Sequence, residues 1–176
     1  MSLFRLLSFF AAVIAIGACG FQPMYGQRAG NTATEDLAAI EIKPISGRIG
    51  QYLHNQLLDR LNPRERPVNP EYVLRVTLVE SVTRLAVRKS ALATRANLVL
   101  NANFILYGAR SEKMNSLFSG KSEVTSSYNI FDSDFATLMA EKEARNRAAI
   151  EISNNIRARL TVFLQQRKAS QGPPGK

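Results

Sequence analysis

Residues 96–107 read ANLVLNANFILY, and the period of this stretch decides the fold class. Its even positions are all apolar, whereas its odd positions include three asparagines, at residues 97, 101 and 103. Alternation of apolar and polar residues at every second position is typical of a strand with one buried face, and helical spacing fits it poorly. The stretch therefore predicts a long, half-buried strand near the middle of the chain.

Three further segments show a strand pattern. Tyr72–Val79 has one wholly apolar face, and its β pattern can be followed to Val87. Residues 117–131 carry polar side chains at the odd positions from 119 to 127, which places their apolar side chains on the other face. A short alternation within residues 38–43 ends at Pro44. These patterns predict three more strands.

Two segments show helical spacing. The residues Ile49, Leu53, Leu57 and Leu61 predict a helix from about Gly47 to Leu61, with Ser46 as its N-cap. Asp132-Ser133-Asp134 supplies an N-cap for a second helix that runs to about Lys168. The order β-α-β-β-β-α predicts an α+β fold, in which two helices pack on one face of a four-stranded, mostly antiparallel sheet.

The predicted elements are long for a domain of this size. A helix of about 34 residues spans roughly 51 Å. The central strand, if it runs from Thr94 to Arg110, reaches about 56 Å. A compact globule of this chain length is only about 40 Å across. We therefore expect an elongated domain.

The first eighteen residues have the features of a secretory signal peptide. Arg5 provides a positive start, residues 6–18 are uncharged, and the only cysteine of the chain, Cys19, follows Gly17-Ala18. An apolar run of this length is shorter than the roughly 20 residues that a spanning helix needs. The arrangement resembles a bacterial lipobox, in which the cysteine is lipidated and becomes the new N-terminus. Cys19 is thus expected to be an anchor and not a catalytic thiol.

This interpretation sets the domain organisation. Residues 1–18 are the cleaved signal peptide, and residues 19–36 form the lipidated cysteine and a tether. Residues 37–168 are one α+β domain, and residues 169–176 are a disordered tail. By resemblance to lipoprotein sorting signals, Gly20 after the cysteine favours the outer membrane.

The charge balance points to an anionic partner. The chain has 23 Lys and Arg against 14 Asp and Glu, a net charge of +9, and loses only Arg5 with the signal peptide. Export makes nucleic acid an improbable partner, whereas anionic phospholipids and phosphate-bearing glycolipids are abundant outside the cytoplasm. The basic excess therefore indicates contact with lipid or glycolipid.

The basic residues are concentrated between Val82 and Arg95. This segment carries Arg84, Arg88, Lys89 and Arg95 and no acid, and it joins two predicted strands. Such residues crowd the tip of a hairpin and can bind phosphates. The alternative is a solvated hairpin end that protects its strands from aggregation. Lys121 joins the same patch only if the strand register brings it there.

The residues that carry catalysis are scarce. The chain has one Cys and one His, and it lacks a phosphate-binding loop, a nucleophile elbow and a paired-His motif. Glu141 and Glu143 are two apart, do not share a helix face, and are expected to be solvated. The sequence thus predicts no catalytic residue, no metal site and no cofactor beyond the lipid on Cys19.

The second sheet face is polar but poor in charge. It carries Asn97, Val99, Asn101, Asn103, Ile105, Thr125, Ser127 and Asn129. The core of an interface is also poor in charge, so a partner could cover this face. The alternative is a sheet face that is simply exposed to solvent.

The segment that starts at the cysteine, Cys19-Gly20-Phe21-Gln22-Pro23-Met24-Tyr25-Gly26, resembles the mature start of the LPS-assembly lipoprotein family LptE. It is most similar to the alphaproteobacterial-type branch that begins Cys-Gly-Phe-x-Pro-Leu-Tyr-Gly, with Met24 in place of the leucine. The order of elements and the acidic turn before a long closing helix extend the similarity over nearly the whole mature chain.

The resemblance implies a non-enzymatic protein of the outer membrane, lipid-anchored and facing the periplasm and a barrel lumen. Members of the family plug the β-barrel LptD, assist its assembly and bind lipopolysaccharide through basic residues of the sheet and its loops. On this chain those residues are expected to be Arg84, Arg88, Lys89, Arg95 and Lys121. Two alternatives stay open: an auxiliary lipoprotein of a phospholipid-trafficking transporter, and an exported enzyme.

Overall fold

The computed structural model describes residues 35–86, 93–109 and 115–171. They belong to one compact unit, which extends from Ala33 to Lys176. A short helical turn covers residues 35–38. The elements that follow are β1 (Ile40–Ile42), α3 (Arg48–Leu61), β2 (Tyr72–Ala86), β3 (Ala93–Gly108), β4 (Ser116–Asn129) and α4 (Asp134–Gln171).

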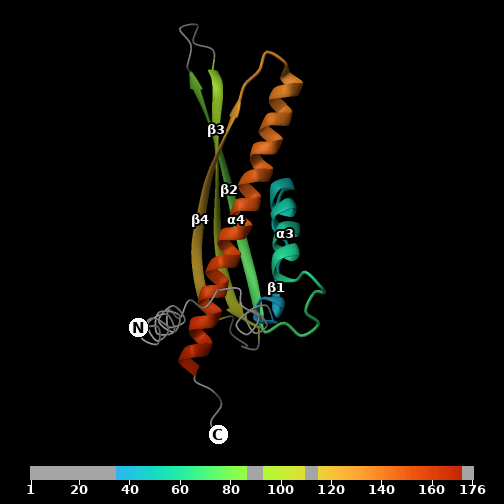
Figure 1. Cartoon of the computed structure of the whole chain (residues 1–176), viewed down its shortest axis with the longest axis vertical. Coiled ribbons are helices and arrows are strands. Elements are labelled where there is room, and N and C mark those ends of the chain that lie inside the picture. The colour runs from blue at the N-terminus through green and yellow to red at the C-terminus, as the bar shows by residue number, and fades with distance from the viewer. Residues whose placement is uncertain (1–34, 87–92, 110–114, 172–176) are drawn as a thin grey trace, which may run out of the picture. The chain divides into compact units, whose positions relative to one another are not determined.

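The strands form one sheet in the order β1-β2-β3-β4 (Figure 1). β1 runs parallel to β2, and β2, β3 and β4 are antiparallel neighbours. The predicted α+β fold, with its mostly antiparallel sheet and its order β-α-β-β-β-α, is confirmed. The elements are as long as expected, since the 38 residues of α4 span about 57 Å.

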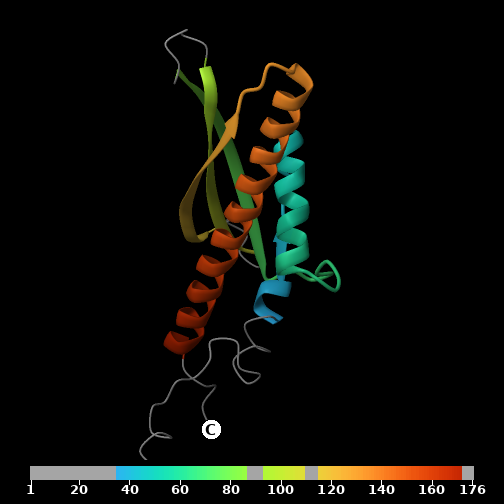
Figure 2. The ribbon, with the colours of Figure 1, turned by 45° about the horizontal axis from the view of Figure 1, so that its top comes forward.

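The core lies between the helices and the even-numbered face of the sheet. Every even position of β3 from Ala96 to Leu106 is completely buried, as the alternation predicts. Leu53, Leu57 and Leu61 of α3 are also completely buried. Both helices lie on the same side of the sheet (Figure 2), so neither α3 nor α4 covers its odd-numbered face.

The two helix starts differ from each other. Ser133 caps α4, because its hydroxyl accepts a hydrogen bond from the Ala136 N–H at 3.3 Å, which agrees with the predicted cap. The prediction of Ser46 as the cap of α3 is wrong: Gly47 occupies that position and forms no side-chain cap. Its φ of 83° is a conformation that glycine adopts without strain.

Both predicted limits of the domain shift outward. α4 continues past Lys168 to Gln171, since helix-compatible residues precede the Gly172-Pro173 break, so the start of the expected tail is helical. Asp36, predicted to lie in the tether, belongs to the turn at residues 35–38. Its carboxylate forms an ion pair with Lys168 at 2.7 Å.

Two arginines of α4 occupy the outer edge of β4. Arg147 donates to the Ser127 carbonyl at 3.3 Å, and Arg159 donates to the Lys121 carbonyl at 2.7 Å. The twelve residues between the arginines span about 18 Å of helix. The six residues between the carbonyls span about 20 Å of strand. The arginines thus occupy acceptors that an edge strand would otherwise offer to another chain.

Candidate functional site

The strand ends of β2 and β3 carry two of the predicted basic residues. Arg84 lies opposite Ala96, and Arg95 lies opposite Leu85. Because side chains alternate along a strand, Arg84 belongs to the helix-covered face and Arg95 to the open face. Arg88 and Lys89 lie outside the described residues, in the segment that joins the two strands. We call this end of β2 and β3 the basic tip.

Lys121 is not part of the basic tip. It lies opposite Asn103, whereas Arg95 lies opposite Asn129. The eight residues from Lys121 to Asn129 correspond to about 27 Å of strand. Lys121 instead forms an exposed ion pair with Glu123 at 3.1 Å. The register therefore separates this lysine from the other predicted binding residues, and its role in binding remains a prediction.

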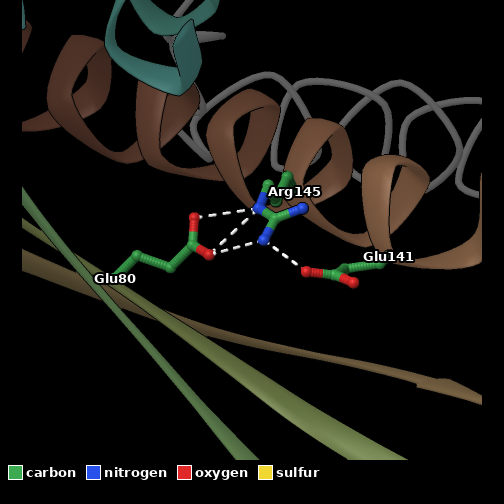
Figure 3. A network of polar contacts seen from close by, with 3 residues as sticks. All are labelled: Glu80, Glu141 and Arg145. Atoms are coloured by element: carbon green, nitrogen blue, oxygen red, sulfur yellow. Dashed lines mark hydrogen bonds and ion pairs between the residues drawn. The ribbon is translucent and has the colours of Figure 1, made fainter. Parts of the chain in front are cut away.

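A charged network fastens α4 to β2 below the basic tip (Figure 3). Arg145 donates from Nε to both carboxylate oxygens of Glu80 at 3.0 Å, and from Nη2 to one of them at 2.9 Å. It also pairs with Glu141, one turn earlier on the helix. These partners, Glu80 foremost, raise the pKa of the Arg145 guanidinium above its ordinary value. The network holds the first turns of α4 against the sheet.

The prediction that Glu141 and Glu143 are solvated is wrong for Glu141. Its side chain is about three-quarters buried because it pairs with Arg145. Glu143 is mostly exposed, with a weaker contact of 3.9 Å to Arg147. The sequence could have predicted both helix pairs, because Glu141 and Arg145, like Glu143 and Arg147, are four residues apart on one helix.

Tyr128 lies beside this network on the helix-covered face. Its side chain is only 8% exposed. Burial, followed by the negative charge of Glu141, raises the pKa of the Tyr128 phenol above its ordinary value. Arg84 acts in the opposite direction, which indicates that its charge reaches the same part of the site.

The open sheet face is free of charge over part of its length, although it also carries Arg75, Arg95, Lys121 and Glu123. Two adjacent rows across β2, β3 and β4 carry no charged residue: Ser81, Val99 and Thr125, then Thr83, Asn97 and Ser127. The Ser127 hydroxyl donates to the Asn97 side-chain oxygen at 2.7 Å. The side-chain oxygen of Asn101 in the neighbouring row is buried and has no hydrogen-bond partner. This part of the face is therefore suited to contact with another surface.

The described residues offer little else for chemistry. No group of three or more His, Cys, Asp or Glu residues among them could hold a metal ion. None of the helices in the described ranges is both long and apolar enough to cross a membrane. Cys19 lies outside the described residues.

Several solved structures of lipoproteins have a fold similar to that of this chain. A lipoprotein from Caulobacter crescentus CB15 is 27% identical, with a TM-score of 0.62, over 78% of this chain and 98% of its own. A minor lipoprotein from Acinetobacter baumannii shares the fold at 16% identity, with a TM-score of 0.53, over 70% of this chain and 90% of its own. Rare lipoprotein B from Shewanella oneidensis shares it at 14% identity, with a TM-score of 0.50, over 75% of this chain and 95% of its own.

No curated protein sequence matches this chain. The family model described as "LptE: Lipopolysaccharide-assembly" matches residues 37–160, which include both helices for most of their length and all four strands. The chain therefore belongs to the LptE family of lipopolysaccharide-assembly proteins.

Proposed function

We propose that this protein is an outer-membrane lipoprotein, anchored through an acylated Cys19, that partners an LptD-type β-barrel and binds lipopolysaccharide during its assembly at the outer membrane. Family membership supports the general role, and the lipoprotein relatives support the anchor. The role is non-enzymatic: the protein holds and positions a glycolipid and a partner protein.

One observation carries the lipopolysaccharide assignment: the two cations of the basic tip that the structure describes, Arg84 and Arg95, form no ion pair with another described residue. Within the described residues, neither Arg84 nor Arg95 takes part in an ion pair, whereas Arg145 of α4 is paired twice. An arginine can bind a phosphate through two parallel hydrogen bonds. Because Arg84 and Arg95 belong to opposite faces of the hairpin, the tip can meet phosphates on both sides.

The open sheet face is the surface that we assign to the barrel partner. Its two uncharged rows lie next to the basic tip, so a partner that covers them leaves the tip accessible. Lys121 and Glu123, farther along β4, neutralise each other and add little net charge to the contact. A polar, uncharged surface can be buried with a smaller desolvation cost than a charged one.

A charge-matched comparison tests the assignment of the basic tip. One variant replaces Arg84, Arg88, Lys89 and Arg95 with serine, and its control replaces four exposed arginines elsewhere with serine: Arg48, Arg64, Arg66 and Arg157. We expect the tip variant to lose affinity for lipopolysaccharide at low salt by about tenfold or more. The control should bind as the unmodified protein does, because only the position of the charges differs. Both variants should keep the circular dichroism spectrum of the unmodified protein.

Unchanged affinity of the tip variant at low salt would contradict the assignment. Equal binding of the unmodified protein to phosphatidylglycerol vesicles and to lipopolysaccharide would favour the phospholipid-trafficking alternative. For the partner, we expect a large β-barrel to co-purify with the full chain from the outer membrane. Normal arrival of lipopolysaccharide at the cell surface after depletion of the protein would refute the role as a whole.

A further inference from the structure

Exposed apolar side chains are concentrated in β2 and around the start of α4. Among the described residues, seven of nine large exposed apolar side chains come from two segments, residues 79–85 of β2 and residues 131–139 around the start of α4. In the first turns of α4, Phe135, Leu138 and Met139 are 72%, 58% and 46% exposed. Isolated exposed apolar residues need no explanation, but a cluster marks an interaction surface.

The start of α4 lies at the same end as the basic tip. β4 ends at Asn129, which pairs with Arg95, and the Ile130 N–H donates to the Thr94 carbonyl at 3.0 Å. The chain therefore leaves the sheet beside the tip and enters α4 after four intervening residues. Figure 1 shows the first turn of α4 and the ends of β2 and β3 at one end of the domain.

α3 does not extend alongside the first turns of α4, where Phe135, Leu138 and Met139 lie. The two helices run in the same direction (Figure 1), and Arg60 of α3 donates to Asn154 of α4 at 2.7 Å. Twelve residues of helix, about 18 Å, separate Arg60 from the first residue of α3. The start of α3 is thus level with about residue 142 of α4. Residues 135–139 lie beyond it, as Figure 2 also shows for the first turns of α4.

Core packing does not account for these residues. Phe135, Leu138 and Met139 have the spacing i, i+3, i+4 and share one face of the helix. In this part of α4, the residues that pack toward the core are Ala140 and Ala144. The first turns of α4 therefore carry an additional apolar face, where a surface helix normally carries polar residues. We name Phe135, Leu138 and Met139 the apolar face of α4.

We infer that the apolar face of α4 binds the acyl chains of the same glycolipid whose phosphates the basic tip binds; this inference rests on the proposed function. An amphiphile with anionic phosphates and alkyl chains is complementary to an apolar surface beside unpaired cations. Arg84 and Arg95 supply those cations on the strand side. Asp132 and Asp134 place negative charge at the start of the helix, which repels phosphates there and favours their binding on the strand side.

A tryptophan reporter tests the inference directly, because the chain contains no tryptophan. Phe135→Trp places the reporter in the apolar face, and Val68→Trp places a control in the exposed loop between α3 and β2, at a residue 90% exposed. The purified full chain is titrated with diphosphoryl lipid A and, separately, with the acyl-free glucosamine disaccharide bisphosphate. We expect lipid A alone to shift the emission of Phe135→Trp to the blue, and neither compound to shift that of Val68→Trp.

Affinity measurements separate this inference from the proposed function. Leu138→Ser with Met139→Ser should weaken lipid A binding about tenfold or more and leave binding of the acyl-free bisphosphate unchanged. Val68→Ser with Val162→Ser, which also removes two exposed apolar side chains, should bind both compounds as before. If lipid A binds with no shift at residue 135 and no loss in the serine variant, the inference is wrong and the proposed function stands.

Three other results would overturn the inference. If lipid A does not bind the unmodified protein, the proposed function fails as well. A blue shift produced by protein concentration alone would assign the apolar face to a second copy of the chain. A shift produced by a purified β-barrel partner in the absence of lipid A would assign it to that protein.

Discussion

Gly120 of β4 lies against the ring of Phe104, and its replacement by alanine should destabilise the fold. A Cβ atom at residue 120 would lie 2.5 Å from Cζ and 2.9 Å from Cε1 of Phe104. The ring cannot move outward, because Phe104 is completely buried. It also packs at 5.9 Å from Phe118, which itself stacks on Phe163 at 4.8 Å. The added methyl therefore displaces either the ring or the strand.

Overpacking of this kind costs about 1–3 kcal/mol of the free energy of unfolding. A loss of about 2 kcal/mol should lower the urea midpoint by about 1 M. The assay is equilibrium unfolding in urea, followed by far-ultraviolet circular dichroism. Gly108→Ala is the matched control, because a Cβ there would meet its nearest side-chain atom, in Leu117, at an ordinary 3.5 Å. The control should be neutral or slightly stabilising.

A double-mutant cycle identifies the cause. Phe104→Leu alone should also destabilise the protein, since it leaves a cavity in the core. Combined with Gly120→Ala, it should give a smaller loss than the sum of the two single losses, by about 1 kcal/mol or more. Additivity to within about 0.5 kcal/mol would refute the proposed contact between residues 104 and 120.

Two further predictions concern the network below the basic tip. Arg145→Met should cost about 1–3 kcal/mol of the free energy of unfolding, because it leaves the Glu80 and Glu141 carboxylates without their shared cation; an unchanged urea midpoint would contradict this. Tyr128, whose pKa is raised on folding, should make stability fall as the pH rises above about 10, since the unfolded chain then releases a proton that the folded protein retains. Urea midpoints at pH 9 and pH 11 measure this loss, and Tyr128→Phe should lessen it; an equal loss in the variant would exclude this tyrosine as a source.

Much of the architecture could be predicted from local patterns. The alternation in residues 96–107 identified the buried side chains of β3, because the direction of a side chain depends only on its position along the strand. The four-residue spacing in α3 identified its buried face for the same kind of reason. The end of α4 was placed three residues too early, since no local signal before Gly172 stops the helix.

The arrangement of the candidate site could not be predicted in the same way. The Arg145–Glu80 ion pair joins residues 65 apart in the sequence, and no spacing rule relates them. Lys121 seemed able to join the basic tip because its strand is adjacent, yet the register places it eight residues from the partner of Arg95. The apolar face of α4 lies in the part of that helix that extends beyond α3, and no local pattern predicts how far the two helices overlap.

Local sequence patterns specify which residues form strands and helices, which faces they bury and where the basic charge is concentrated, since each of these depends on residues close together in the chain. Three features depend on the folded structure: the register between β3 and β4, the opposite faces of Arg84 and Arg95, and the extension of α4 beyond α3. Register and helix overlap depend on many side-chain contacts between distant segments, and no single segment contains them. Folding therefore brings the basic tip, whose residues are close in sequence, next to the apolar face of α4, whose residues are distant from it in sequence.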